Sequence, residues 1–345
     1  MLTFTPDVLH EATTKIFRAA GADEENTRIV ADHLIDANLC GHDSHGVLRI
    51  PSYVQAIQRG QLAPAAKPSV VRETAAMTLI DAHHTFGQVS ALFAADEVVA
   101  KAKEHGVAVA GTFHGTHIGR LGYYPTRAAQ RGVVLFVAYG SLGSSGVPYG
   151  GRKGAFGTNP ISIGFPADGD DPFLLDFATT TIAAGKVSVA RDKHEQLPPN
   201  SAIDKDGRPT TDPHAVAQGG LLTFGGHKGY ALSMMSLLLS NVLVRPDSDA
   251  AASPDSAGSN VSPEGARVFF LAIDAAVFGD GAPTAAAGVF EKVRDTPPAE
   301  GFERVLIPGE PERLSAQRRR AEGIPVAEDT WAAVQKTAAS LSVSL

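Results

Sequence analysis

The middle of the chain alternates between helix-like and strand-like segments, and this alternation limits the possible folds more than any other feature. Residues 90–106 space their apolar side chains as an amphipathic helix that ends at a glycine. A short apolar run follows at 107–112, a second helical segment covers 124–130, and another apolar run covers 133–138. Helices that alternate with short strands are typical of a layered α/β core.

The second half of the chain has a different character. Residues 140–226 are rich in glycine, proline and threonine and contain only short strand-like runs, which indicates a loop-rich region with antiparallel or mixed strands. Residues 228–243 are predicted to form a buried helix, and residues 266–273 a late strand. Between them, residues 246–265 contain almost no large apolar side chain, so we expect a flexible surface insertion there.

Both ends of the chain are predicted to be helical. Thr5 and Pro6 form an N-cap and first-turn pair, and a second helix covers residues 23–39. Two further helices are predicted at 311–322 and 327–341. Within the first of these, the three consecutive arginines at 318–320 are interpreted as a solvated helix face.

Composition and charge exclude several classes of partner. The formal net charge is −7 and the pI is about 5.9, so no positive field is available to attract nucleic acid or an anionic membrane. No segment is apolar and long enough to span a bilayer, and the N-terminus has no secretory pattern. Cys40 is the single cysteine, which excludes an intramolecular disulfide and a multi-thiolate metal site. We therefore expect a soluble cytoplasmic protein.

The common phosphate-binding motifs are absent. Gly279 and Gly281 form a Gly-x-Gly pair, but Thr284 stands where the dinucleotide fingerprint requires a third glycine. Gly185 and Lys186 lack the other residues of a P-loop. A nucleotide would have to be bound in another way.

Residues 41–53 pose the main chemical question, because two histidines lie close to a serine and an arginine. Metal binding by His42 and His45 would need a third protein ligand, which this stretch does not clearly supply. A nucleophilic Ser44 would need a glycine-rich elbow, which is absent. A polar turn without chemistry and a proton-transfer group beside an anion-binding arginine are the two interpretations that remain.

A second histidine-rich loop favours the chemical interpretation. Residues 111–124 follow an apparent strand and contain His114 and His117, which taken alone would fit the edge of a core equally well. Histidine exchanges a proton near neutral pH, and arginine binds a carboxylate through two parallel hydrogen bonds. The pair His45 and Arg49 therefore suits an anionic substrate whose oxygen gains or loses a proton.

Several long motifs occur in the order and spacing of one known family. The chain resembles the malate/L-lactate dehydrogenase family of nicotinamide-dependent oxidoreductases that lacks a Rossmann fold, over residues 5–330. The absence of a glycine fingerprint is expected for such a protein. The motifs that carry the resemblance lie at residues 36–62, 117–124, 156–166, 176–187, 207–213, 225–232 and 306–312.

The resemblance implies roles for individual residues. His45 would be the proton donor or acceptor and Arg49 would bind the substrate carboxylate, while His117 is a second candidate for the acid/base. The cofactor would be NAD or NADP, with no metal. Each cofactor contact could instead have only a structural role, such as shaping a turn or capping a strand. The cofactor-binding residues implied are Ser141, Gly157, Thr158, Asn159, Asp176, Ala178, Thr179, Thr180, Lys186, Lys228, Pro308, Gly309 and Glu310.

The sequence departs from the family pattern in three places. Many relatives have a serine where this chain has Thr180, a tryptophan is missing near residues 197–207, and the insertion at 246–265 is unusual. The proposed acid/base is not affected, but substrate identity and the choice between NAD and NADP stay open.

The segments and the resemblance together predict an α/β fold of mixed, α+β-like character. A non-Rossmann cofactor domain, 66–305, would contain a mainly antiparallel sheet flanked by helices. The N-terminal helical part, 1–65, would pack with the C-terminal helices, 306–345. The resemblance also implies a homodimer with the active site near the interface.

The expected activity is hydride transfer between nicotinamide and a small 2-hydroxy or 2-oxo carboxylic acid. One alternative is an NADPH-dependent reductase of a cyclic imine carboxylate, in which the histidine protonates nitrogen. A second, from another class, is a non-catalytic ligand-binding protein that has kept the fold.

Overall fold

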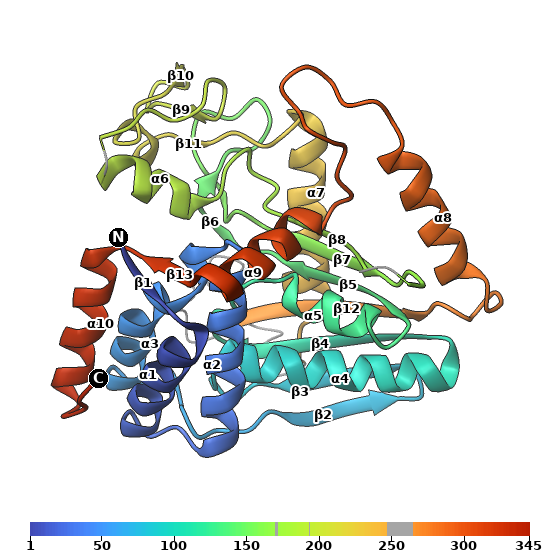
Figure 1. Cartoon of the computed structure of the whole chain (residues 1–345), viewed down its shortest axis with the longest axis horizontal. Coiled ribbons are helices and arrows are strands. Elements are labelled where there is room, and N and C mark those ends of the chain that lie inside the picture. Colours follow the sequence, from blue (N-terminus) through green and yellow to red (C-terminus); the bar gives the residue numbers. More distant parts are fainter. Residues whose placement is uncertain (170–171, 193, 247–264) are drawn as a thin grey trace.

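The computed structural model describes residues 1–169, 172–192, 194–246 and 265–345. Most of the insertion predicted at 246–265 therefore lies outside the described residues. The centre of the fold is a seven-stranded sheet (Figure 1). Its strands run in the order β2 (Ser69–Thr74), β3 (Met77–Asp81), β4 (Val107–Gly115), β12 (Ala266–Asp274), β5 (Val133–Tyr139), β7 (Ile161–Phe165) and β8 (Phe173–Phe177).

Five of the six neighbouring strand pairs in this sheet are antiparallel, and β3 with β4 is the parallel pair. The prediction of a mixed, mainly antiparallel sheet in an α/β fold is confirmed. The late strand at 266–273 takes the central position between β4 and β5. Because a strand from late in the chain pairs between β4 and β5, the strand order differs from that of consecutive βαβ units.

Both faces of the sheet are covered because the central strands are apolar on both sides. Along β12, Val268 and Phe270 pack into a core with α4 (Gly87–His105) and α5 (Tyr123–Ala129). Phe269 faces the opposite side and packs with Val244 near α7 (His227–Leu237). Successive residues of one strand thus fill two different cores.

The two chain ends form one helical part, as predicted. An antiparallel pair of β1 (Leu2–Phe4) and β13 (Ile324–Val326) joins them, and they share a hydrophobic core. The side chain of Thr5 accepts a hydrogen bond from Val8 N, and that of Asp23 accepts one from Asn26 N, which caps the first two helices. The helices are α1 (Pro6–Ala19), α2 (Glu24–Leu39), α3 (Ile50–Gln58), α9 (Glu310–Glu322) and α10 (Glu328–Ser340).

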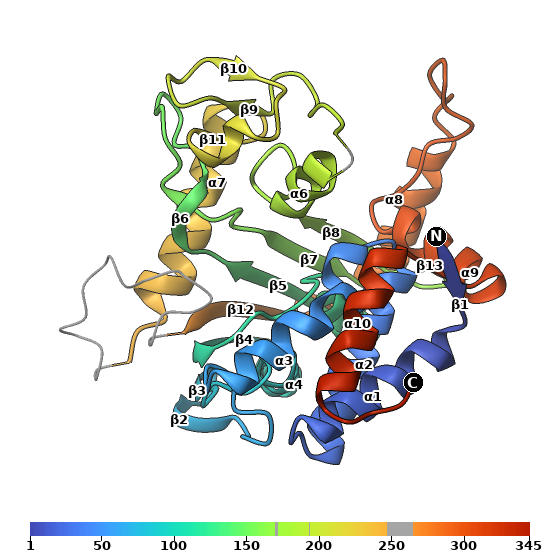
Figure 2. The same cartoon turned by 90° about the vertical axis from the view of Figure 1, so that its left-hand side faces the viewer.

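The loop-rich half folds into a smaller unit beside the main sheet (Figure 2). Helix α6 (Ala184–Asp192) lies there with the 3₁₀ turn Ala215–Ala217 and a four-stranded sheet. Helix α8 (Ala282–Arg294) packs against the edge strand β8 through Phe290 and Phe173, whose ring centroids are 6.4 Å apart. The small sheet contains β10 (Pro209–Thr210), β9 (Ala202–Ile203), β11 (Gly220–Leu221) and β6 (Leu142–Gly146).

The prediction that residues 228–243 form a buried helix is wrong for one side of that segment. Helix α7 continues as a π-helical turn, η4 (Leu238–Leu243). Its serines face the sheet, where Ser240 Oγ accepts a hydrogen bond from Gly140 N and so occupies the inner side. Large apolar side chains are left on the outer side, 37–64% exposed: Leu232, Met235, Leu238, Val242 and Leu243.

None of the helices in the part of the chain that the structure describes is long and apolar enough to cross a membrane.

Candidate active site

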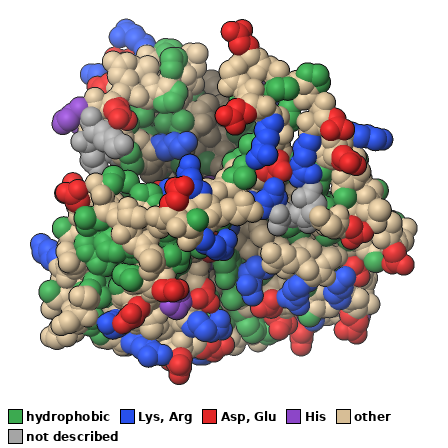
Figure 3. Space-filling model, viewed as in Figure 1, with side chains coloured by type: hydrophobic (Ala, Val, Ile, Leu, Met, Phe, Trp, Pro, Cys, Tyr) green, Lys and Arg blue, Asp and Glu red, His purple; other side chains and the backbone are tan. Residues whose placement is uncertain are grey.

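A cleft lies where the helical part, the main sheet and the loop-rich unit meet. It consists of two adjoining cavities of about 700 and 330 Å³. The face seen in Figure 3 is hollowed in this region, between the loop-rich unit and the helical part. The residues that line both cavities are His45, Gly119, Leu121, Thr158, Pro160, Ala183 and Gly185.

Asn38, at the end of α2, shapes the turn that carries the predicted acid/base. Its amide oxygen accepts a hydrogen bond from Val47 N at 2.9 Å, and its amide nitrogen donates one to Asp43 at 2.7 Å. Gly46 is required because a Cβ there would lie 2.1 Å from the Asn38 amide oxygen. On the other side, Arg319 donates two hydrogen bonds to Asp43, at 2.6 and 3.1 Å. The turn is therefore pinned between α2 and α9.

The role of Arg319 corrects the sequence interpretation of residues 318–320. The side chain of Arg319 is only 12% exposed, so this arginine does not belong to a solvated face. Its partner Asp43 lies on the turn η1 (Asp43–His45), which was too distant in sequence to be foreseen as a partner.

His45 and Arg49 are held by the same backbone segment. His45 Nδ1 lies 2.9 Å from the hydroxyl of Ser44, and Arg49 Nε donates to the carbonyl of Ser44 at 2.6 Å. No partner of the terminal Nη groups of Arg49 is found among the described residues. Since Arg49 lines the smaller cavity, those groups are available to an anionic ligand there.

His117 lies beside His45, as the sequence suggested for a shared site. Their rings are stacked at 25°, with centroids 5.4 Å apart. The Nδ1 atom of His117 is 2.7 Å from the hydroxyl of Tyr53. The other histidine of that loop, His114, is not in the cleft and instead pairs with Asp81 at 3.1 Å.

Both cleft histidines are held in the neutral state. Burial lowers the pKa of His45 to about 3, and the positive charge of Arg49 contributes in the same direction. Burial, followed by the charge of Arg49, also lowers the pKa of His117 well below its usual value. Neutral imidazoles can accept a proton or donate an N–H hydrogen bond at pH 7. A bound carboxylate would offset the charge of Arg49 and so raise both pKa values.

Ser141, Gly157 and Thr158 line the smaller cavity. Asn159 lies behind them, 1% exposed, where its amide oxygen accepts from Ser141 N at 2.8 Å and its amide nitrogen donates to Ser233. Asn159 therefore positions this wall without facing the cavity.

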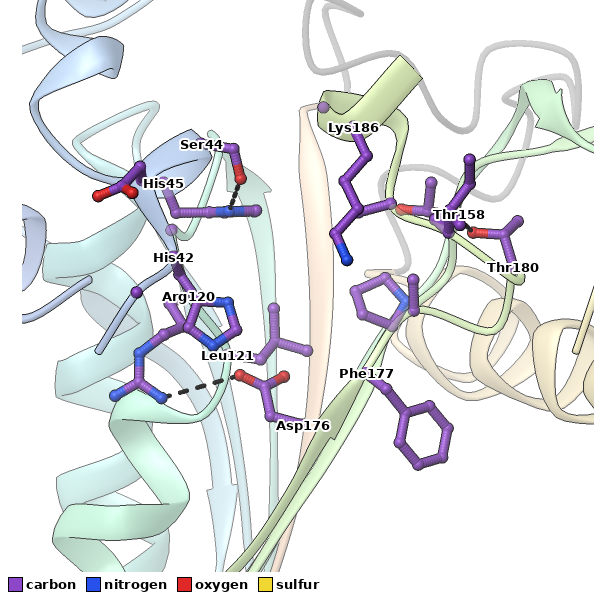
Figure 4. Close-up of a pocket in the computed structure, with 18 of the residues that line it drawn as sticks. His42, Ser44, His45, Arg120, Leu121, Thr158, Asp176, Phe177, Thr180 and Lys186 are labelled. Atoms are coloured by element: carbon purple, nitrogen blue, oxygen red, sulfur yellow. Dashed lines mark hydrogen bonds and ion pairs between the residues drawn. The ribbon is translucent and has the colours of Figure 1, made fainter. Parts of the chain in front are cut away.

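Five of the residues predicted to hold the cofactor line the larger cavity: Thr158, Asp176, Ala178, Thr180 and Lys186. Lys186 reaches into it from the side opposite His45 (Figure 4), and its ammonium group has no partner among the residues that the structure describes. Thr179 is fully buried and donates to the carbonyl of Thr158 at 3.0 Å, so it joins the two walls from behind.

Sequence reasoning missed Arg120, a buried cation at the cavity floor. It is 4% exposed and lies 2.7 Å from a carboxylate oxygen of Asp36 and 3.9 Å from one of Asp176. Burial alone would lower the pKa of Arg120, but the neighbouring carboxylates raise it above its ordinary value. For Asp176 burial prevails, and its pKa is raised although Arg120 opposes this. An arginine in a glycine-flanked loop is the only signal that the sequence offered.

Besides Asn159 and Thr179, four more of the predicted cofactor residues line neither cavity: Lys228, Pro308, Gly309 and Glu310. Lys228 is exposed in the first turn of α7. Glu310 is buried and accepts hydrogen bonds from Ile307 N at 2.6 Å and from Arg313 at 3.0 Å. Pro308 accepts one from Leu174 N at 3.0 Å. These contacts tie the loop to β8, and a cofactor role for the four residues stays a prediction.

No group of three or more histidine, cysteine, aspartate or glutamate side chains that could hold a metal ion is found within the described ranges.

The fold and the cleft agree with a sequence comparison. The family model described as malate/L-lactate dehydrogenase matches residues 4–335. The chain belongs to this family of oxidoreductases, and the resemblance inferred from its motifs is confirmed.

Individual relatives cover most of the chain. Hydroxycarboxylate dehydrogenase B of Escherichia coli K12 is 36% identical over 339 residues, which are 96% of this chain and 92% of the relative. A Δ1-pyrroline-2-carboxylate/Δ1-piperideine-2-carboxylate reductase of Pseudomonas putida is 39% identical over 229 residues, covering 66% of this chain and 67% of that protein. Among solved structures, sulfolactate dehydrogenase of Methanocaldococcus jannaschii has a TM-score of 0.87 at 31% identity, covering 99% of this chain and 98% of that one.

Proposed function

We propose that this protein is an NAD(P)-dependent dehydrogenase that transfers a hydride between nicotinamide and a small 2-hydroxy or 2-oxo carboxylic acid. One observation carries the proposal: Arg49, whose Nη groups have no partner among the described residues, lines the smaller cavity beside two stacked, neutral histidines. The names of several relatives, which refer to hydroxycarboxylate, malate and sulfolactate dehydrogenases, support the same class of substrate.

The smaller cavity would bind the acid. Its volume of about 330 Å³ suits a small ligand, and Arg49 offers two parallel N–H groups for a carboxylate. His45 and His117 line the same cavity and would contact the oxygen on the neighbouring carbon. Binding the carboxylate at Arg49 fixes the orientation of that oxygen relative to the imidazoles.

The larger cavity would bind the dinucleotide. Lys186 is a cation without a partner among the described residues, and it faces a volume of about 700 Å³, as binding of a diphosphate or phosphate requires. Ile182, Val189 and Phe224 give the same cavity an apolar side for a flat ring. When bound, the nicotinamide group would supply or accept the hydride.

The histidines of the cleft would carry out the proton transfer. In the oxidation direction, a neutral imidazole accepts the hydroxyl proton as the carbon loses its hydride, which the low pKa of His45 permits at pH 7. In the reduction direction the same nitrogen returns the proton. The charge of the bound carboxylate helps here, because it offsets Arg49 and stabilises the imidazolium.

A second candidate is reduction of a cyclic imine carboxylate, which the Pseudomonas putida relative favours. Arg49 would hold the same carboxylate, and a histidine would protonate nitrogen instead of oxygen. A non-catalytic binding protein is the less favoured alternative, since it has no use for two neutral imidazoles beside an arginine whose Nη groups lack a partner within the described ranges.

The test is a panel of 2-hydroxy acids, 2-oxo acids and cyclic imine carboxylates, assayed with both oxidised and reduced cofactors by nicotinamide absorbance. We expect turnover of at least one acid, with a preference for one cofactor. No turnover, together with unchanged NADH and NADPH fluorescence on adding protein, would refute an enzyme of this class.

We also propose a homodimer, as the resemblance implied. The apolar outer side of α7 and η4 is the surface that we expect a second copy to cover. Light scattering tests this, because a monomeric mass at assay concentration would contradict it.

A further inference from the structure

The hydroxyl of Tyr53 joins two buried polar side chains. It lies 2.7 Å from Nδ1 of His117 and 2.7 Å from Nε2 of Gln88, which donates to it. Tyr53 is 6% exposed and Gln88 is 1% exposed, so water does not compete for these bonds. The Tyr53 ring is itself fixed, because it packs near Phe17 and Phe86 in the helical core.

The direction of the two hydrogen bonds at the Tyr53 hydroxyl follows from proton counting. An amide nitrogen can only donate, so the Tyr53 oxygen accepts from Gln88. The tyrosine then has one hydrogen left, and His117 Nδ1 is the remaining partner within the described residues. If Nδ1 carried a proton as well, the Tyr53 hydrogen would be buried without an acceptor, which is unfavourable. Nδ1 is therefore the acceptor, and the proton of the neutral ring is on Nε2.

Turning the Gln88 amide over would reverse the direction of these hydrogen bonds, but at a greater cost in free energy. In the present orientation its amide oxygen is buried and has no hydrogen-bond partner in the part of the chain that the structure describes. In the reversed orientation the amide nitrogen would have no acceptor among the described residues for either hydrogen, and orphaned donors are rarer in proteins than under-satisfied carbonyl oxygens. The orientation with Nε2 of Gln88 toward Tyr53 is favoured.

The backbone beside His117 is equally constrained. Thr116 Oγ1 accepts a hydrogen bond from Gly87 N at 2.8 Å and donates one to the carbonyl of Thr85 at 2.9 Å. A Cβ at Gly87 would lie 2.4 Å from the carbonyl oxygen of His117. Ring and backbone are thus fixed together, and Nε2 is the nitrogen left to face the cavity that His117 lines.

His45 is not constrained in this way. Its Nδ1 atom pairs with the Ser44 hydroxyl, which can donate or accept. The ring can therefore carry its proton on Nδ1 and leave Nε2 unprotonated, as a group that takes up a proton at Nε2 must do.

We propose that Tyr53, oriented by Gln88, is a positioning residue that holds His117 as the Nε2–H tautomer, so that His117 donates a fixed hydrogen bond to the reacting oxygen while His45 exchanges the proton. The assignment of these two roles rests on the proposed dehydrogenase function. In oxidation the substrate hydroxyl would give its proton to His45 Nε2, a bound nicotinamide would accept the hydride from the substrate carbon, and the new carbonyl oxygen would keep the hydrogen bond from His117.

His117 is unsuited to the proton transfer itself. If a neutral Nε2–H ring gave up its proton, Nδ1 would need the proton of Tyr53 in return. Burial raises the pKa of Tyr53 to about 12, so the tyrosine does not release it readily.

The proton position is measured directly by two-bond ¹H–¹⁵N correlation NMR of protein labelled in its histidines, without substrate at pH 7. His117→Asn assigns the signals. Wild-type protein should show His117 with an unprotonated Nδ1 and a protonated Nε2. In Tyr53→Phe and Gln88→Met, we expect His117 to populate both tautomers. The kcat should fall by about tenfold in Tyr53→Phe. This decrease is smaller than the roughly hundredfold decrease expected when a hydrogen-bond donor to the reacting oxygen is removed completely.

Tyr124→Phe is the matched control. Tyr124 is an equally buried tyrosine whose hydroxyl donates to the carbonyl of Ile118, the residue after His117. Loss of the Tyr124 hydroxyl perturbs the loop that carries His117 but removes no hydrogen bond to the His117 imidazole. The His117 tautomer should therefore stay as in the wild type.

A wild-type His117 with its proton on Nδ1 would overturn the inference, and so would wild-type tautomer signals in both Tyr53→Phe and Gln88→Met. Because the spectra are recorded without substrate, this readout does not depend on turnover. A panel of acids that gives no turnover would refute the proposed function instead.

Discussion

Acidification should destabilise the folded protein through its buried neutral histidines. Burial lowers the pKa of His33, His45 and His117 below the ordinary value of 6.5. Each of these rings is neutral in the folded state near pH 6 but takes up a proton when the chain unfolds. The unfolded state therefore binds more protons in this window, and by linkage the free energy of unfolding falls as the pH falls.

The magnitude follows from the slope of about 1.4 kcal/mol per pH unit for each proton taken up. Between about pH 7.5 and pH 5.5, one histidine with a depressed pKa loses roughly 1.4 kcal/mol, so three lose roughly 4 kcal/mol. This is a large part of the 5–15 kcal/mol typical of a domain. Most carboxyl groups contribute little, because the window lies above their unfolded pKa of about 4. Asp176, whose pKa burial raises, works in the opposite direction, because the folded state binds its proton more readily than the unfolded state does.

Urea unfolding at the two pH values, followed by circular dichroism, measures this difference. His45→Asn should retain roughly two thirds of the pH-dependent loss, because it removes one of three such rings. Equal free energies of unfolding at both pH values in the wild type would refute the claim that the cleft histidines are held neutral. If His45→Asn loses as much free energy of unfolding between the two pH values as the wild type, His45 is not one of the histidines that cause the loss.

Further predictions concern the cleft and its support. Arg49→Lys should raise KM for the acid by about thirtyfold and change cofactor affinity by less than about twofold, because it keeps the charge but loses the paired N–H groups; equal effects on both ligands in steady-state kinetics would contradict this. Lys186→Met should weaken cofactor binding by about tenfold, most strongly at low salt, as measured by nicotinamide fluorescence titration. Gly46→Ala should cost about 2 kcal/mol or more of stability and most of the activity, since its Cβ would overlap the Asn38 amide. Gly288→Ala, where a Cβ meets nothing within 4 Å in helix α8, is the control and should be neutral or slightly stabilising in thermal melts.

The elements of the fold could be predicted from local patterns. The cap at Thr5 and the periodicity of residues 90–106 predicted the helices α1 and α4, because these signals act within one or two turns. The order of strands could not be read in this way. The central place of β12 depends on pairing with β4 and β5, which are more than a hundred residues away along the chain.

The chemistry of the site was visible in the sequence, but its support was not. His45, Arg49 and His117 stood out by residue type, and the structure brings them to one cavity. Asn38 and Arg120 look ordinary in sequence, because a buried amide or guanidinium matters only through partners brought from other elements.

The outer side of α7 shows another limit of pattern reading. A run of leucine and methionine predicts burial, yet in this chain the serines of the segment take the inner side. Periodicity identifies the helix but does not decide which side packs on the sheet when both contain small or apolar residues. The division of the chain at residues 65 and 305 likewise stays a prediction.

Hydride transfer from the substrate carbon is the central claim, and isotope transfer tests it most directly. The substrate is a 2-hydroxy acid that the panel shows to be turned over, with deuterium at C2, and the reduced cofactor is analysed by mass spectrometry after turnover. We predict that the reduced nicotinamide carries the deuterium, and that His45→Asn forms this product at least about a hundredfold more slowly than the wild type. Oxidation of the acid with no deuterium in the cofactor would contradict the account.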